Sequence, residues 1–412
     1  MLSCLRYLGS TALGATRAIY SRTQNVEATV YARISAVMGQ QTTEEHILAL
    51  TMSKCISNLK FWHDEDVIKA SVVLFDALTS DYTTSRSVCA LPACTELLAQ
   101  HGLNHFAFLR VPTLFELHTR FYFTLARLAF RPPHLSKFDT FVAPLDHMFA
   151  FIGQQNNIRS EAVLQSLPTL CRFVTGIVEG ALTIPAYLNL FDWLHPEYLS
   201  MLVRAIEAWW DQPDVAVPIL SLFSELCHNK ANRITFPSSS ANSILLFKET
   251  SRVIHLYGAC ILRASDQTSD IDSDDFYQQR LQGISLCFKI MTHALQGNYV
   301  NFGVFALYND HALSQALSTS LRLILTLPLR TAFAYPDISN QFYALLEVLF
   351  RHHIELIIEN ESKVFMGLVM ALHEGLSGFD VANSSKCAAA LGKTKLLIYV
   401  SCFFNSYSNI LS

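Results

Sequence analysis

The stretch "PEYLSMLVRAIEAWWDQPDVAVPILSLFSELC", from Pro196 to Cys227, predicts two helices joined by a short turn. Between Glu197 and Trp210 the apolar side chains recur every three or four residues, at Tyr198, Leu202, Ala205, Ile206 and Trp209. This period places one apolar stripe along one face of a helix. After the polar turn "DQPD" a second apolar helix is expected near Val217 to Cys227. The local unit is therefore a helical hairpin.

The same unit recurs later in the chain. Apolar residues at helical spacing predict a pair over 244–262 and 277–296, and another over 311–327 and 338–358. The pairs begin at intervals of roughly 45 to 65 residues, at the long end of the spacing of HEAT-type hairpins. Alternating, strand-like segments are scarce. We therefore predict an all-α protein, a HEAT-like helical-hairpin repeat solenoid over residues 31–391.

A single hairpin of this kind is too weak to be stable alone. Each helix offers four or five large apolar side chains, whose burial contributes about 1.5 to 3 kcal/mol apiece. Ordering the backbone costs about 1 to 2 kcal/mol per residue, which cancels or exceeds that gain. The hairpins are therefore expected to stack and to cover one another's apolar faces.

Composition excludes several classes of protein. The net charge is −4, from 34 acidic and 30 basic residues, and it gives no basis for binding nucleic acid. Hydrophobic residues make up 51% of the chain, yet no run approaches the roughly 18 apolar residues that a membrane-spanning helix needs. Neither nucleic acid nor membrane insertion is expected.

The 10 cysteines are scattered and show no CxxC pair. Cys89 and Cys94 are the closest two, with four residues between them. Buried, reduced thiols are the expected state of these cysteines, and a metal or redox site is the alternative. We predict no resident metal and no cofactor.

Catalytic motifs are absent: the sequence has no GxGxxG, P-loop, HExxH or GxSxG pattern. The best carboxylate pair is Asp192 with Glu197, with His195 between them, and an α/α-toroid hydrolase could use such a group as acid and base. Positions at a helix start explain both carboxylates more simply. His352 and His353 are adjacent on a predicted helix, so they point apart and make a poor metal pair. No catalytic residue is predicted.

Three segments differ from the helical pattern. Residues 1–30 carry arginines and no acid before Glu27, so they are either an incomplete first repeat or a mitochondrial transit peptide. The acidic segment 263–276 is expected to be a solvated loop, with a phosphorylation segment or a contact for a basic partner as alternatives. Residues 392–412 do not continue the repeat pattern. We expect this tail to be a gene-model artefact.

Several stretches resemble one known family. These are "SSANSILLFKETSRVIHLYG" (239–258), "YVNFGVFALYND" (299–310) and "FYALLEVL" (342–349), and they are similar to the exportin-7 (Ran-binding protein 16) family of the importin-β superfamily. The strong resemblance spans about 190–378, with a weaker one back towards residue 17.

The resemblance implies a transport receptor that carries protein cargo through nuclear pores. Such receptors bind the small GTPase Ran and the Phe-Gly repeats of the pore, and they occur in the nucleus and the cytoplasm. Full-length members are more than twice as long, and their Ran-binding repeats lie mainly near the amino terminus. We therefore expect the 412 residues to be a fragment. A general helical-repeat scaffold without transport activity is the alternative.

The loop "GNYVNFGVFALYND", from Gly297 to Asp310, is unusual because it is rich in aromatic residues, among them Tyr299, Phe302 and Phe305. In a solenoid these rings could fill the gap between adjacent hairpins, and a contact with cargo or a pore protein is the alternative. Gly297 and Gly303 are expected to allow close turns around the rings. No other partner-binding residue is predicted.

Overall fold

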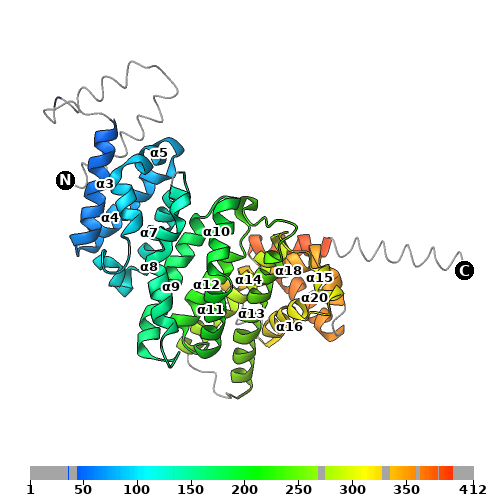
Figure 1. Ribbon diagram of the computed structural model, residues 1–412. Helices are drawn as coiled ribbons and strands as arrows, with labels where there is room; N and C mark the ends of the chain where they lie inside the picture. Colours follow the sequence, from blue (N-terminus) through cyan, green and yellow to red (C-terminus); the bar gives the residue numbers. More distant parts are fainter. Residues whose placement is uncertain are drawn as a thin grey trace, which may run out of the picture. The chain divides into compact units, whose positions relative to one another are not determined.

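The computed structural model describes residues 36, 44–132, 134–267, 274–326, 335–358, 362–378 and 380–392 (Figure 1). All of the regular secondary structure within these ranges is helical, which confirms the all-α prediction. Among the same residues no helix has both the length and the apolar character needed to cross a membrane. The predictions for residues 1–30, for the tail beyond 392 and for the middle of the acidic segment, 268–273, lie outside the described residues.

The chain forms two compact units. The first holds residues 1–156 and 165–190, and the second holds residues 157–164 and 191–412. The sequence pattern did not indicate this division.

The first unit contains short helices joined by tight corners. Its elements are α3 (Glu44–Phe61), α4 (Glu65–Ser80), α5 (Tyr82–Ala90), α6 (Pro92–Ala99), η1 (Ala107–Arg110), η2 (Pro112–Leu114), α7 (Phe115–Ala129), η3 (His134–Lys137) and α8 (Phe138–Gly153). It also holds α9 (Glu161–Gly180) from residue 165 onward and α10 (Ile184–Leu194) up to residue 190.

Local sequence explains the corners of the first unit. Asp81 follows α4 directly, and its carboxylate accepts hydrogen bonds from the backbone N–H groups of Thr83 and Thr84 at 3.0 and 3.1 Å. The carboxylate therefore caps the start of α5. It also accepts a hydrogen bond from the hydroxyl of Thr83, and this bond, followed by the one from the backbone of Thr84, lowers the pKa of Asp81. Pro92 occupies the first turn of α6, where it needs no N–H partner.

Small residues let the helices of the first unit approach closely. A Cβ added at Gly176 of α9 would lie 2.3 Å from the carbonyl oxygen of Thr119 on α7. Tyr122 and Phe173 stack beside this crossing, with ring centroids 4.2 Å apart. On its other side α7 packs against α4, so α4, α7 and α9 form a continuous layer of the first unit.

The second unit contains longer helices. After the end of α10 come α11 (Glu197–Ala208), α12 (Pro213–Leu226), η4 (Lys230–Asn232), α13 (Asn242–Gln267), α14 (Asp274–Gln296), α15 (Gly303–Leu307), α16 (Ala312–Thr326), α18 (Pro336–His352), α19 (Ile354–Ile358) and α20 (Ser362–Leu376). A final helical run covers 381–392. Its N–H groups at Ala382 and Asn383 bond to the Asp380 carboxylate.

Helix ends differ from the sequence prediction in two places. Both ends of the acidic segment are helical, because α13 continues to Gln267 and α14 begins at Asp274, so only 268–273 separates them. The single helix predicted over 338–358 is divided at His353 into α18 and α19.

The helices of the second unit stack in two layers. α11, α13 and α16 form one layer, and α12, α14 and α18 form the other. Contacts along each layer are more extensive than those between the two helices of a hairpin such as α13 and α14. At Gly258 of α13 an added Cβ would lie 2.4 Å from Cγ2 of Thr319 on α16, so successive hairpins are closely packed. The predicted stacking of helical hairpins is therefore confirmed.

Candidate functional site

The carboxylates proposed for a hydrolase lie at two helix ends of different kinds. Asp192 is exposed in the last turn of α10 and accepts a hydrogen bond from Asn242 at 3.2 Å. Glu197 is exposed in the first turn of α11. The predicted helix-start position is thus right for Glu197 and wrong for Asp192. The ring of His195 stacks on Phe191 at 5.4 Å, so packing accounts for this side chain.

The two adjacent histidines point apart, as the sequence predicted. His352 ends α18 and is exposed. His353 is half-buried: its Nε2 donates to the carbonyl of Leu295 at 3.3 Å, and its ring meets Phe302 edge-on at 5.7 Å. Burial lowers the pKa of His353, so the imidazole is neutral at physiological pH. This side chain serves packing.

The aromatic loop between α14 and α16 holds a cluster of rings against α13. Phe305 is 2% exposed, and its ring lies 5.2 Å from that of Phe247 on α13. Phe302 lies 5.1 Å from the same ring, in a T-shaped arrangement. The loop includes a short helix, α15, and Lys248 of α13 holds its end through Asp310 at 2.8 Å. The packing role is therefore confirmed for Phe302 and Phe305.

The turns of the aromatic loop depend on asparagines more than on glycines. Asn298 and Asn309 adopt the left-handed conformation, with φ of 53° and 51°. Gly297 is needed for a different reason, since an added Cβ would lie 2.4 Å from the Tyr299 ring. At Gly303 an added Cβ would lie 3.3 Å from Oδ1 of Asn301, which is a tight contact with a side chain. The predicted role of Gly303 in a close turn stays a prediction.

Two large side chains of this loop that the sequence did not single out are exposed. Leu307 is 78% exposed and Tyr308 is 76% exposed, at the end of α15. They follow the buried Phe305, and the backbone N–H of Tyr308 bonds to the carbonyl of Val304 at 3.1 Å. A large apolar pair is therefore presented to solvent on a firmly held turn.

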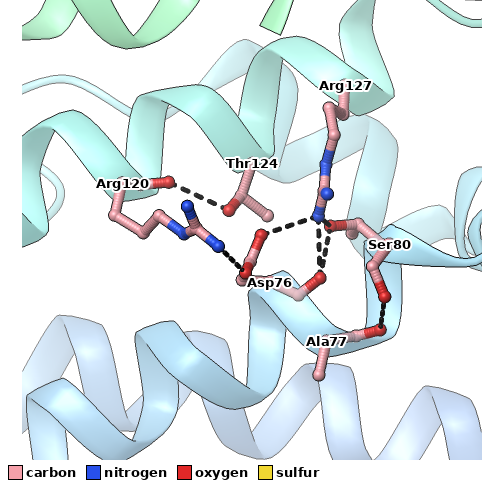
Figure 2. Close-up of polar contacts among 7 residues, drawn as sticks. Asp76, Ala77, Ser80, Arg120, Thr124 and Arg127 are labelled. Carbon is pink, nitrogen blue, oxygen red and sulfur yellow. Dashed lines mark hydrogen bonds and ion pairs between the residues drawn. The ribbon is translucent and has the colours of Figure 1, made fainter. Parts of the chain in front are cut away.

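An ion-pair cluster joins α4 to α7 in the first unit (Figure 2). The carboxylate of Asp76 accepts hydrogen bonds from Arg120 and from Arg127, the latter at 2.7 Å. Arg127 also donates to the backbone carbonyl of Asp76 at 2.7 Å and to Thr79. Both guanidinium groups contact the ring of Phe123, at 5.0 and 4.8 Å from its centroid. The geometry is that of a structural clamp, because every oxygen of Asp76 already has a donor.

A second charged cluster lies after α12. Arg233 is fully buried, and its Nη2 donates to the side chain and the carbonyl of Glu225 at 2.8 and 2.9 Å. Its Nε donates to the carbonyl of His228 at 3.1 Å. The neighbouring residues Ala231 and Asn232 have positive φ, so the chain turns tightly around the guanidinium. The arginine thereby satisfies the carbonyls at the end of α12.

Among the cysteines that the structure describes, all are free and nearly all are buried. Burial raises the pKa of Cys227 to about 11 and that of Cys55 to about 12. These thiols are therefore protonated at physiological pH and behave as small apolar groups, as expected. The thiols of Cys89 and Cys94 lie close to the imidazole of His134.

Comparison with known proteins gives consistent matches. A family model described as "Exportin-7-like, TPR domain" matches residues 11–116. Exportin-7-A of Xenopus laevis is 36% identical over 373 residues, which is 88% of this chain and 34% of that protein. Ran-binding protein 17 of Homo sapiens is 35% identical over 372 residues, again 88% of this chain and 34% of that protein. The chain is similar to the exportin-7 proteins over this span. It covers about a third of the length of the curated relatives it matches.

The homology to exportin-7 extends further than the sequence motifs indicated. Ran-binding protein 16 of Drosophila melanogaster is 34% identical over 390 residues, or 92% of this chain and 35% of its own length. The family model also covers a region where only a weak resemblance was expected. Its match begins within the segment 1–30, and these relatives give no support to a mitochondrial transit peptide. TPR and HEAT units are both helical hairpins, so this description agrees with the stacked pairs.

Proposed function

We propose that this chain is part of a nuclear transport receptor of the exportin-7 type, which binds protein cargo and moves it through nuclear pores with the help of Ran. The observation that carries the proposal is the 36% identity to Exportin-7-A along 88% of the chain. The stacked layers of the second unit support it, because they offer a long surface with no need for catalytic groups. On this proposal the protein acts by binding alone and occurs in both nucleus and cytoplasm.

The exposed end of the aromatic loop is the proposed partner contact. Leu307 and Tyr308 project from a turn that buried rings and the Lys248 to Asp310 ion pair hold in place. The Lys248 hydrogen bond also lowers the pKa of Asp310, so the pair stays charged at physiological pH. Tyrosine is one of the residue types that are enriched among those that dominate binding energy, and Leu307 extends the apolar surface beside Tyr308. The contact proposed for Tyr299, Phe302 and Phe305 is thus moved to the two residues that follow them.

Retention of pure partners on the immobilised chain tests the proposal. The partners are Ran loaded with a non-hydrolysable GTP analogue, Ran loaded with GDP, a Phe-Gly repeat peptide and the same peptide with serine in place of phenylalanine. We expect the chain to retain the Phe-Gly peptide over its serine control and GTP-loaded Ran over GDP-loaded Ran. A chain that melts normally yet retains none of them would point to a scaffold without transport activity.

Two double variants separate binding from the alternatives. The double variant Leu307→Ala, Tyr308→Ala should keep the melting temperature of the wild type. It should retain the partner that binds the wild-type chain, GTP-loaded Ran or the Phe-Gly peptide, about tenfold or more weakly. Asp192→Asn with Glu197→Gln removes the hydrolase carboxylates, and it should leave partner retention unchanged. Loss of binding in the second variant, with binding intact in the first, would contradict the assignment of the contact.

A further inference from the structure

Three potential metal ligands meet at a corner of the first unit. Cys89 lies near the end of α5, Cys94 lies in the first turns of α6, and His134 begins η3. All three side chains are buried, and their ligand atoms lie within 4.8 Å of one another. The fold therefore brings together two thiols and an imidazole from segments some 40 residues apart in the chain.

The backbone around the corner holds these groups in place. α5 ends at Ala90 and Pro92 starts α6, so Leu91 is at once the cap of both helices and turns the chain between the two cysteines. The N–H of Cys94 bonds to the carbonyl of Leu91 at 3.0 Å. The ring of His134 is fixed by a hydrogen bond from its Nε2 to the carbonyl of Cys89 at 3.0 Å. Hydrogen bonds to backbone carbonyls thus hold Cys94 and His134 in place.

The imidazole hydrogen bond has the form found in metal sites. A histidine ligand usually donates its other ring N–H to a carboxylate or a backbone carbonyl, which fixes the tautomer. Because Nε2 of His134 donates to Cys89, Nδ1 carries the free lone pair. His134 would therefore bind a metal through Nδ1.

We propose that Cys89, Cys94 and His134 bind one zinc ion. Two thiolates and a neutral imidazole are ligands that zinc prefers, and four intervening residues fall within the cysteine spacings of known zinc sites. Binding releases the two thiol protons to solvent, so two thiolates balance the charge of Zn²⁺ and the buried site is neutral overall. A neutral site is the form that the interior tolerates best.

The geometry needs only a small contraction. With zinc to sulfur bonds of about 2.3 Å, tetrahedral coordination places two sulfur atoms about 3.8 Å apart. The three ligand atoms lie within 4.8 Å of one another, so modest side-chain rotations would bring them to that spacing. Because three ligands leave one coordination position open, a water molecule or a further group completes the tetrahedron.

A cavity beside the cluster gives access and room for that fourth ligand. It has a volume of about 350 Å³, and His134 lines it together with Lys137 and Phe141. Thr95 and Leu98 of α6 form another wall. Zinc in this corner would join the α5 to α6 turn to the segment between α7 and α8. It would therefore act as a staple within the first unit.

Metal analysis of the 412-residue chain tests the proposal directly. Protein purified without chelator should hold about one zinc per chain after dialysis, and Co²⁺ in its place should give the thiolate charge-transfer and visible bands of a tetrahedral site. Cys94→Ser and His134→Gln should each lower the affinity by about 100-fold or more, whereas Cys55→Ala, at another buried thiol of the same unit, should not change it.

If a variant fails to fold, measurements on the wild-type chain still decide whether zinc binds. Zinc should raise the melting temperature of the wild-type chain, and a chelator should lower it again. A chain that takes up no zinc and gives no cobalt thiolate band overturns the proposal. The same holds if Cys94→Ser folds and binds zinc as tightly as the wild type, or if mild oxidant converts Cys89 and Cys94 to a disulfide that added zinc does not prevent.

Discussion

The buried guanidinium of Arg233 provides the sharpest test of the energetics of this fold. Glu225→Gln keeps the shape of the side chain and removes the negative charge that lies 2.8 Å from Nη2 of Arg233. Arg233 is fully buried, and its side chain cannot reach bulk water without moving the end of α12. Its positive charge would therefore lose the carboxylate that lies beside it.

The magnitude follows from the cost of an uncompensated buried charge. Breaking such a pair by removing one partner typically costs about 3 to 5 kcal/mol. For a unit of roughly 200 residues, each 1 kcal/mol shifts the melting temperature by about 2 to 4 °C, so Glu225→Gln should melt about 6 to 20 °C lower. The hydrogen bonds of Arg233 to the carbonyls of Glu225 and His228 persist, which favours the lower part of that range.

Thermal unfolding followed by circular dichroism measures the shift, and hydrogen exchange in α12 locates it. Arg351→Gln is the matched control, because it breaks an exposed pair with Glu347 on α18 and should cost about 0.5 kcal/mol or less. Adding Arg233→Met to Glu225→Gln also removes the buried positive charge, so the double variant should be more stable than the sum of the two single changes predicts. Equal melting of Glu225→Gln and the wild type would refute the reasoning.

Three further predictions concern packing and pH. Phe305→Ala should destabilise the second unit by about 3 to 5 kcal/mol, whereas Tyr308→Ala should change stability by less than about 0.5 kcal/mol; similar denaturation midpoints for the two variants would contradict the packing role. Gly176→Ala places a methyl group 2.3 Å from the Thr119 carbonyl, so it should force α7 and α9 apart and lower the melting temperature, and an unchanged melting curve would count against this close approach. Burial lowers the pKa of His101 to about 4, so the neutral ring contributes about 3 kcal/mol above pH 6.5, and this contribution falls as the pH drops towards 4. His101→Phe should flatten that part of the stability curve, and an equally steep curve in this variant would assign the effect to other groups.

The sequence by itself determined that this chain is helical and that its helices come in pairs. The helical period is a local property, so the apolar stripe from Tyr198 to Trp209 is visible without any knowledge of its partner. The weakness of a lone hairpin is also calculable from composition, and it correctly predicted stacking. The family resemblance was also visible in the sequence, because contiguous stretches of residues carry it.

The tertiary structure alone decided which of these residues are buried and which meet one another. Periodicity places Phe305 and Tyr308 in one loop, but only the approach of α13 makes the first a core residue and leaves the second in solvent. His134 joins Cys89 and Cys94 through contacts that span some 40 residues of chain, and no local pattern encodes such a meeting. Local sequence sets the face of a helix, whereas the neighbour that covers this face is chosen by packing across the whole unit.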